Sequence, residues 1–155
     1  MSAQTGIDPR GPRFGAGITA VLLLVVIGLS LGGLTIPALI IFAAQTLLFA
    51  WGAFAGIARH PYGLLFKRVV RPRLKPPAEL EDPAPPTFAQ GVGLVISAIG
   101  VILTLIGLTP ALPIAAALAF VAAFLNSVFG YCLGCQIYLL FVRARVLGRR
   151  PAAAA

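Results

Sequence analysis

Hydrophobic residues are concentrated in four long stretches that contain no charged side chain. They span residues 14–34, 36–57, 88–108 and 112–142. Each has at least the ~20 residues that a helix needs to cross ~30 Å of hydrocarbon. A helix also pairs its own backbone groups, and each unpaired group in lipid costs several kcal/mol. The pattern predicts an all-α integral membrane protein with four transmembrane helices, forming a single membrane domain over residues 1–155.

The fourth stretch is longer than one simple span requires. Its 31 residues would extend about 46 Å as a continuous helix at 1.5 Å per residue. We therefore expect a bend or break within it, and Gly130 and Gly134 are the candidate positions.

Charged residues lie only between and beyond the apolar stretches. All twelve basic residues fall before the first, between the second and third, or after the fourth, where Arg143, Arg145, Arg149 and Arg150 lie. The other two connections carry no charge. Because basic loops stay in the cytoplasm, the pattern predicts that both termini and the connecting loop 58–87 are cytosolic.

The composition agrees with a membrane protein and limits the classes of partner that the chain can have. Hydrophobic residues make up 59% of the chain and charged residues 10%, with a mean hydropathy of +0.99. A soluble domain could not have such a surface. The net charge of +8 is accounted for by topology and by attraction to anionic lipid. We therefore expect the lipid bilayer as a partner and no nucleic acid.

The cytosolic loop has two parts. In residues 62–71, apolar Leu65, Phe66 and Val69 share one helical face and basic side chains the opposite one, which predicts a short amphipathic helix in the headgroup layer. A frayed end of the second helix explains the same pattern. Residues 72–86 contain six prolines and are expected to be an extended, semi-rigid segment.

The two halves of the chain resemble each other at an offset of about 74 residues. Phe14 corresponds to Phe88 and Gly33 to Gly107. At a slightly larger offset, the sequence Leu-Leu-Phe ending at Phe66 corresponds to the one ending at Phe141. The pattern favours two similar helical hairpins of the same orientation, although apolar helices also resemble one another by chance.

Cys132 and Cys135 are the only cysteines, and their Cys-x-x-Cys spacing is typical of dithiol redox sites. A thiol attacks only as its thiolate, which nearby cations or a helix N-terminus stabilise. If the chain breaks at Gly130, Cys132 lies near the start of a new helix and is the expected attacking thiol, with Cys135 resolving. The repeat places the pair at the cytoplasmic rim, whereas counting back from Arg143 places Cys132 halfway through the bilayer. Inert burial of both cysteines is the alternative.

Other polar residues are candidates for supporting roles. The repeat aligns His60 with Cys135 and Arg59 with Gly134, so both are candidates for activating the thiols. Among residues inside the bundle, the amides of Asn126, Gln136 and Gln45 are costly to bury, and interhelical hydrogen bonding explains them equally well. One imidazole and two thiols do not complete a zinc site within one chain, although a dimer could complete one, so no metal site and no cofactor is predicted.

Three segments together resemble a known family: residues 7–14 with their Asp-Pro-Arg, the loop 71–86, and residues 126–135 with Gly-Tyr-Cys-Leu-Gly-Cys. They are similar to an uncharacterised family of actinobacterial membrane proteins, a domain of unknown function (number 4395). The resemblance implies a multi-pass protein of the bacterial cytoplasmic (inner) membrane, often encoded near thioredoxin-like proteins and sulfurtransferases. It implies no established activity.

Three functions fit these features. The first is a thiol–disulfide or persulfide relay, in which Cys132 attacks a partner, Cys135 resolves, and electrons pass to a thioredoxin-like protein or a quinone. The second is a transporter of a small sulfur compound, and the third a non-catalytic assembly or anchor subunit. Whether the protein is an enzyme stays open, and so does homo-oligomer formation.

Overall fold

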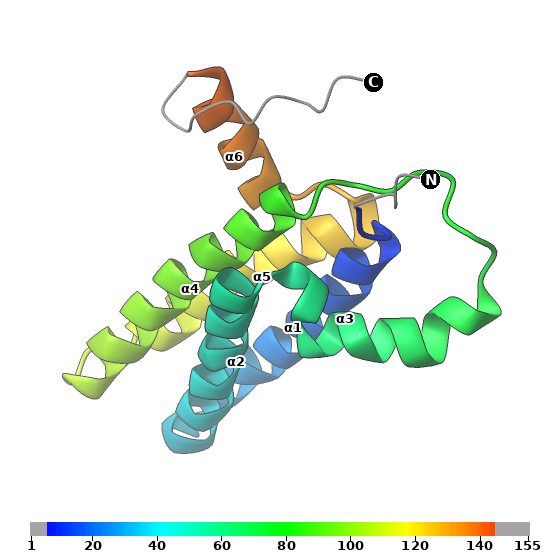
Figure 1. The fold of residues 1–155 in the computed structure, drawn as a ribbon. Helices are drawn as coiled ribbons and strands as arrows, with labels where there is room; N and C mark the ends of the chain where they lie inside the picture. The colour runs from blue at the N-terminus through cyan, green and yellow to red at the C-terminus, as the bar shows by residue number, and fades with distance from the viewer. Residues whose placement is uncertain (1–5, 145–155) are drawn as a thin grey trace.

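The computed structural model describes residues 6–144, so Arg145, Arg149 and Arg150 of the predicted basic C-terminus lie outside the described residues. Four helices are long and apolar enough to cross a membrane: α1 (Arg10–Leu31), α2 (Thr35–Ala55), α4 (Ala84–Leu105) and α5 (Ala111–Phe129). Figure 1 shows them running side by side as one bundle. Residues 6–144 form no strand beyond a single bridge between Ile7 and Glu81. The predicted all-α membrane fold with four spans is confirmed.

The fourth apolar stretch is two helices, because the chain breaks at Gly130. There the backbone has a φ of +66°, a conformation that side chains rarely adopt, and α5 ends. A new helix, α6 (Leu133–Arg143), then runs away from the bundle (Figure 1). The stretch 112–142 is therefore two helices. Its excess length had indicated such a break.

The connection between α2 and α4 contains a separate helical segment. Gly56 ends α2 with a φ of +86°. After it come η1 (Ile57–Arg59), α3 (Pro61–Leu65), η2 (Phe66–Val70) and η3 (Arg71–Arg73). The segment is thus not a frayed end of α2. Of the three apolar residues expected on one face, Phe66 is buried, whereas Leu65 and Val69 are nearly half exposed. Phe66 packs against the protein while the other two are free to contact lipid.

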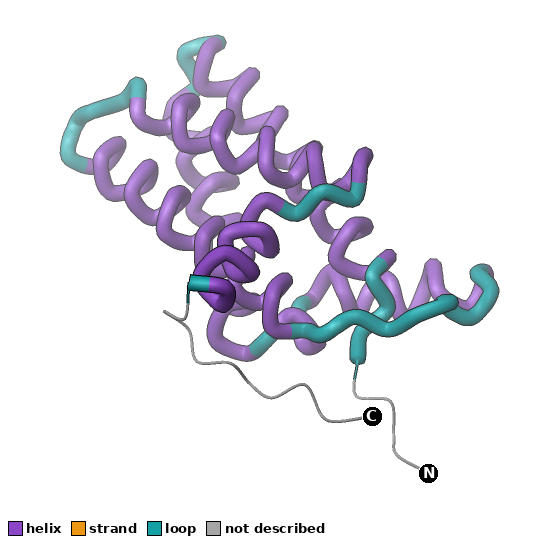
Figure 2. Tube along the Cα trace, turned by 90° about the horizontal axis from the view of Figure 1, so that it is seen from above, coloured by secondary structure: helices purple, strands orange, loops and turns teal. Residues whose placement is uncertain are grey.

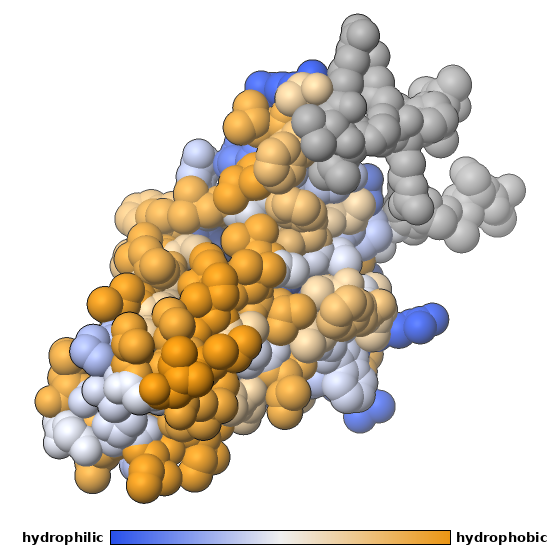
Figure 3. Space-filling model, turned by 90° about the vertical axis from the view of Figure 1, so that its left-hand side faces the viewer, coloured by the Kyte–Doolittle hydropathy of each residue, from blue (hydrophilic) through white to orange (hydrophobic). Residues whose placement is uncertain are grey.

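The two hairpins pack across each other, α1 against α5 and α2 against α4. The buried apolar cluster lies near the two short turns, residues 32–34 and 106–110, and consists of Leu23, Val26, Ala38, Phe42, Leu112, Ala115, Ala116 and Ala119. Only 17–28% of the most apolar stretch of each long helix is buried in the protein. The remaining side chains face outward and cover most of the face shown in Figure 3, as a lipid-embedded bundle requires.

The basic residues within 6–144 all lie in elements at the opposite end, where α1 and α4 begin and α3 and α6 lie. Figure 2 shows the loop before α4 as an extended teal segment on this side of the molecule. The extended loop before α4 is joined to the N-terminal segment there, because Ile7 and Glu81 exchange two backbone hydrogen bonds of 2.9 Å.

The internal repeat has a structural counterpart in each half. Phe14 packs against Phe66 with ring centroids 5.8 Å apart, and Phe88 packs against Phe141 at 6.1 Å. Gly56 and Gly130, which are 74 residues apart, both have positive φ and both end a long helix. Each half is therefore a hairpin of two long helices followed by a shorter helical segment that packs against the first turns of the hairpin.

Candidate dithiol site and its cavity

The cysteine pair lies at the start of α6. Cys132 is the N-cap residue, and its Sγ accepts a hydrogen bond of 3.2 Å from the backbone N–H of Cys135. The two cysteines are joined as a disulfide, with their Cα atoms 5.1 Å apart. The break at Gly130 creates this geometry, because it ends α5 and lets Cys132 take the extended conformation that an N-cap needs.

Close packing against α4 fixes the position of α6. A side-chain carbon added at Gly134 would lie 2.6 Å from Cα of Ala89, so only glycine allows this approach. Phe88 then contacts Tyr138 as well as Phe141, with ring centroids 5.6 Å apart for the first pair. The disulfide is therefore anchored to the first turns of α4.

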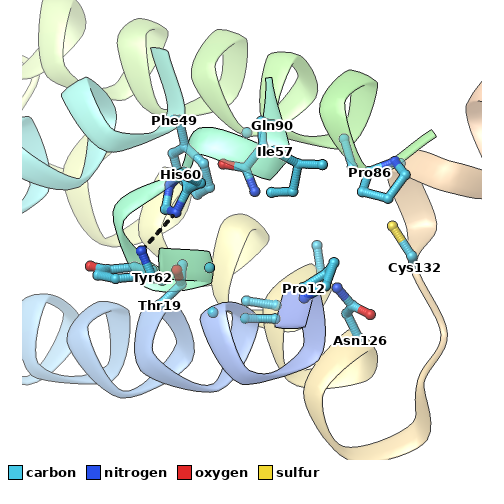
Figure 4. Close-up of a pocket in the computed structure, with 18 of the residues that line it drawn as sticks. Pro12, Thr19, Phe49, Ile57, His60, Tyr62, Pro86, Gln90, Asn126 and Cys132 are labelled. Carbon is cyan, nitrogen blue, oxygen red and sulfur yellow. Dashed lines mark hydrogen bonds between the residues drawn. The ribbon is translucent and has the colours of Figure 1, made fainter. Parts of the chain in front are cut away.

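Cys132 lines a cavity of about 330 Å³ inside this end of the bundle. The walls come from the starts of α1, α4 and α6, the end of α5, and α3 (Figure 4). Most lining residues are apolar, and the polar and charged ones besides Cys132 are Asp8, Thr19, His60, Tyr62, Lys67, Gln90 and Asn126. A pocket of this size with a few converging polar groups is the usual form of a small-molecule site.

Gln90 carries an unpaired polar atom at this cavity. Its Oε1 is buried and has no hydrogen-bond partner within residues 6–144. The side chain lies over Gly52, where an added side-chain carbon would be 2.6 Å from the Cγ of Gln90. Figure 4 shows the amide on the wall between Phe49 and Ile57, with its nitrogen toward the cavity, whereas Oε1 lies against Gly52. A buried, unsatisfied amide costs about 1–3 kcal/mol unless something pairs with it.

His60 is buried, with 4% of its surface exposed, and both ring nitrogens are engaged. Nδ1 accepts from the backbone N–H of Tyr62 at 3.3 Å, so Nε2 carries the proton that it donates to the Leu48 carbonyl at 3.2 Å. Burial lowers the pKa of His60, because desolvation disfavours the imidazolium. The ring is therefore a neutral structural cap for α3 on the cavity wall.

Gln45 belongs to a neighbouring network. Its Oε1 accepts from the Tyr62 hydroxyl at 3.2 Å, and its Nε2 donates to Thr19 Oγ1 at 3.4 Å. Burial raises the pKa of Tyr62, so the phenol stays protonated as this donor. Gln45 itself does not line the cavity, and its hydrogen bonds join α1, α2 and α3.

The structure thus brings together only some of the residues predicted from sequence. Cys132, His60 and Asn126 share the cavity wall. Arg59 is exposed, and its carbonyl accepts from Trp51 Nε1. Gln136 is exposed on α6. Within residues 6–144, no three His, Cys, Asp or Glu side chains are grouped so that they could hold a metal ion.

Two residues at the site were missed in the sequence analysis. Gln90 is the only amide in the stretch 88–108, a signal that was visible but not used. Arg13 lies against the turn before Cys132, where an added side-chain carbon at Gly130 would be 3.0 Å from Arg13 Nε. Arg13 is 117 positions from Gly130 in the chain, so no local pattern indicated this contact.

The fold and site define a class of small membrane protein, a four-span bundle with a cysteine pair and a cavity at one end. A family model described as Domain of unknown function (DUF4395) matches residues 7–143. The chain belongs to this family, as the resemblance predicted. No curated protein and no solved structure matches the chain.

Proposed function

We propose that the protein is a membrane thiol–disulfide relay whose active pair is Cys132 and Cys135, at the cytoplasmic rim of the bundle. The observation that carries the proposal is the position of Cys132 as N-cap of α6, bonded to Cys135 and exposed to the cavity. A cysteine pair with one member at a helix N-terminus is the arrangement that dithiol oxidoreductases use.

The local geometry supports different roles for the two sulfurs. When the pair is reduced, the Cys135 N–H and the N-terminus of α6 stabilise a thiolate at Cys132. This thiolate attacks a disulfide or persulfide sulfur of a thioredoxin-like protein or sulfurtransferase, and a partner thiolate leaves. Cys135 then attacks Cys132 Sγ and forms the intramolecular disulfide. This releases the remaining thiolate of a disulfide partner or, where a persulfide was attacked, the transferred sulfur as hydrosulfide. In reverse, a partner thiolate attacks Cys132 Sγ and expels Cys135.

The positive-inside rule supports a cytosolic location of this rim in a bacterial inner membrane. The basic residues of the segment from η1 to Lys75 lie at the same end as the disulfide. A cytosolic partner therefore has access to α6 without crossing the bilayer.

The cavity lining argues against the transporter of a small sulfur compound. Such compounds are commonly anionic, and most of the wall is apolar, with Asp8 as well as Lys67 at its polar end. An anion in this setting would lose its hydration without a matching set of donors.

The test is mixed-disulfide trapping with a thioredoxin that lacks its resolving cysteine and whose remaining cysteine is activated as the mixed disulfide with thionitrobenzoate, which leaves when Cys132 attacks. We expect Cys135→Ser to accumulate the mixed disulfide, because Cys132 remains able to attack. Cys132→Ser should give at least tenfold less, because it removes the sulfur at the helix N-terminus. With only two cysteines in the chain, gel-shift alkylation with a maleimide reports each state without interference.

Equal trapping by both variants would contradict the assigned roles. A wild-type disulfide that thioredoxin neither reduces nor forms would overturn the relay itself. Circular dichroism of both serine variants provides the control for folding.

A further inference from the structure

We propose that the cavity beside Cys132 binds the ring of a lipid-soluble quinone, which accepts the electrons of the reduced cysteine pair. This inference rests on the proposed relay, since it names the second substrate of the same site. A bound quinone gives a role to the cavity and to Gln90. Thiol exchange with a protein partner requires neither of them.

The position of the cavity favours a ligand from the bilayer. Much of its wall belongs to the membrane-spanning helices, with Phe49 of α2, Ile96 of α4 and Leu118 of α5 among the lining residues. At about 330 Å³ it lies at the lower end of the range for small-molecule sites, enough for one ring and its substituents. An apolar wall favours a neutral molecule, because an uncompensated charge is costly to bury.

Two amides on different helices supply the polar contacts. Gln90 of α4 turns its amide nitrogen toward the cavity, and Asn126 of α5 lies across the cavity nearer to Cys132 (Figure 4). An amide offers both a donor and an acceptor. It can therefore donate to the carbonyl of a quinone and, after reduction, accept from the hydroxyl of the quinol. An ammonium group, which only donates, could not accept from the quinol.

The reaction balances with the two thiols and the quinone alone. The Cys132 thiolate adds to a ring carbon and forms a C–S bond. Cys135 then attacks Cys132 Sγ, so that the S–S bond forms, the C–S bond breaks and the electron pair passes to the ring. The two thiol protons complete the quinol. Two electrons and two protons thus move from the dithiol to the quinone, and a thioredoxin-like dithiol restores the reduced pair.

The experiment follows quinone reduction by the full-length protein in lipid nanodiscs. Protein reduced by thioredoxin is mixed with decylubiquinone, and quinol formation is recorded by absorbance while disulfide formation is recorded by alkylation. We expect one quinol per disulfide. Gln90→Leu should raise the half-saturating quinone concentration about tenfold, the usual effect of losing one hydrogen bond to a buried group. Gln136→Leu, an amide removed from the exposed face of α6, is the matched control and should leave it unchanged.

Binding is measured separately on the Cys132→Ser/Cys135→Ser protein, which cannot react. A photoreactive azidoquinone should label peptides of α4 or α5, and excess decylubiquinone should prevent this. Ala123→Leu, which fills part of the cavity, should abolish the labelling. This variant keeps the inference testable if Gln90→Leu fails to fold.

The outcomes separate the two proposals. If the disulfide exchanges with thioredoxin but no quinol forms and no labelling occurs in the cavity, the quinone inference is overturned and the relay stands. If the azidoquinone labels the cavity but the disulfide does not exchange with thioredoxin, the relay and its electron transfer are overturned. Equal effects of Gln90→Leu and Gln136→Leu would contradict the assigned role of Gln90.

Discussion

The two ends of the bundle differ in how tightly their apolar residues are packed. Near the turns, Phe42, Leu23 and Leu112 are completely buried in a packed cluster. At the other end, Ala122, Ala123 and Gly93 border a cavity. We call these the turn half and the cavity half. In lipid, apolar area alone gives helices no net reason to associate, so close packing must supply the stability. The turn half provides this packing, and the cavity half keeps open space beside Cys132.

Gly100 shows how the packed half is built. A side-chain carbon added there would lie 3.0 Å from Cε1 of Phe42 and closer still to Ala115. The absence of a side chain on α4 therefore makes room for the ring from α2. In the cavity half Gly93 makes similar room for the ring of Phe49, but Ala122 and Ala123 of α5 border open space.

Phe42→Ala should have the largest effect on stability. It opens a void in the turn half, and the cavity penalty of about 24 cal/mol per Å³ predicts a loss of about 2–3 kcal/mol. The free energy of unfolding would be measured by sodium dodecyl sulfate titration from mild detergent. Phe54→Ala is the control, because Phe54 is 85% exposed and faces lipid. Similar losses in both variants would contradict the assignment of the packed core to the turn half.

His60→Ala should cost about 1–2 kcal/mol, because the Leu48 carbonyl and the Tyr62 N–H lose their partner. Burial lowers the pKa of His60 in the folded protein. Wild-type stability should therefore be complete above the unfolded pKa of about 6.5 and fall as the pH drops toward the lower folded value. His60→Ala should lose this pH dependence of stability, which melting curves recorded over a series of pH values would show. Arg59→Ala, an exposed neighbour, should keep it.

Asp8→Asn should have a smaller effect, also confined to the cavity half. Arg10 donates to both carboxylate oxygens, and this hydrogen bonding lowers the pKa of Asp8. The stabilisation is present above the usual carboxyl pKa of about 3.9 and disappears as the pH falls through the lower folded value. Melting temperatures of wild type and variant should therefore differ at neutral pH and converge in strong acid. A constant difference at every pH would show that the ion pair is not its cause.

Ala123→Leu should change stability least, by less than about 1 kcal/mol, because the new side chain enters existing space in the cavity half. A leucine side chain added at Gly100, in the turn half, has no space there and should prevent tight packing of the helices. Thermal unfolding of the two variants in one detergent makes the comparison direct. A large loss at Ala123 would mean that the cavity is not open.

Several features of the site could be predicted from the sequence because they depend on local pattern. The apolar stretches gave the four spans, and the excess length of the last one indicated a break at Gly130. The expected break in turn predicted that Cys132 lies at the start of the next helix. The grouping of Gln90 and Arg13 near Cys132 could not be predicted, since it depends on how α1, α4 and α6 pack.

The sequence alone determined that this chain is a four-span α-helical membrane protein with one cysteine pair, because span length, charge placement and Cys-x-x-Cys spacing are properties of local sequence. Only the tertiary structure decided that Cys132, two amides and a neutral histidine border one cavity, and that Arg59 and Gln136 do not. The physical reason is that apolar helices are nearly interchangeable in hydropathy. Which faces meet is settled by steric fit at positions such as Gly52, Gly100 and Gly134.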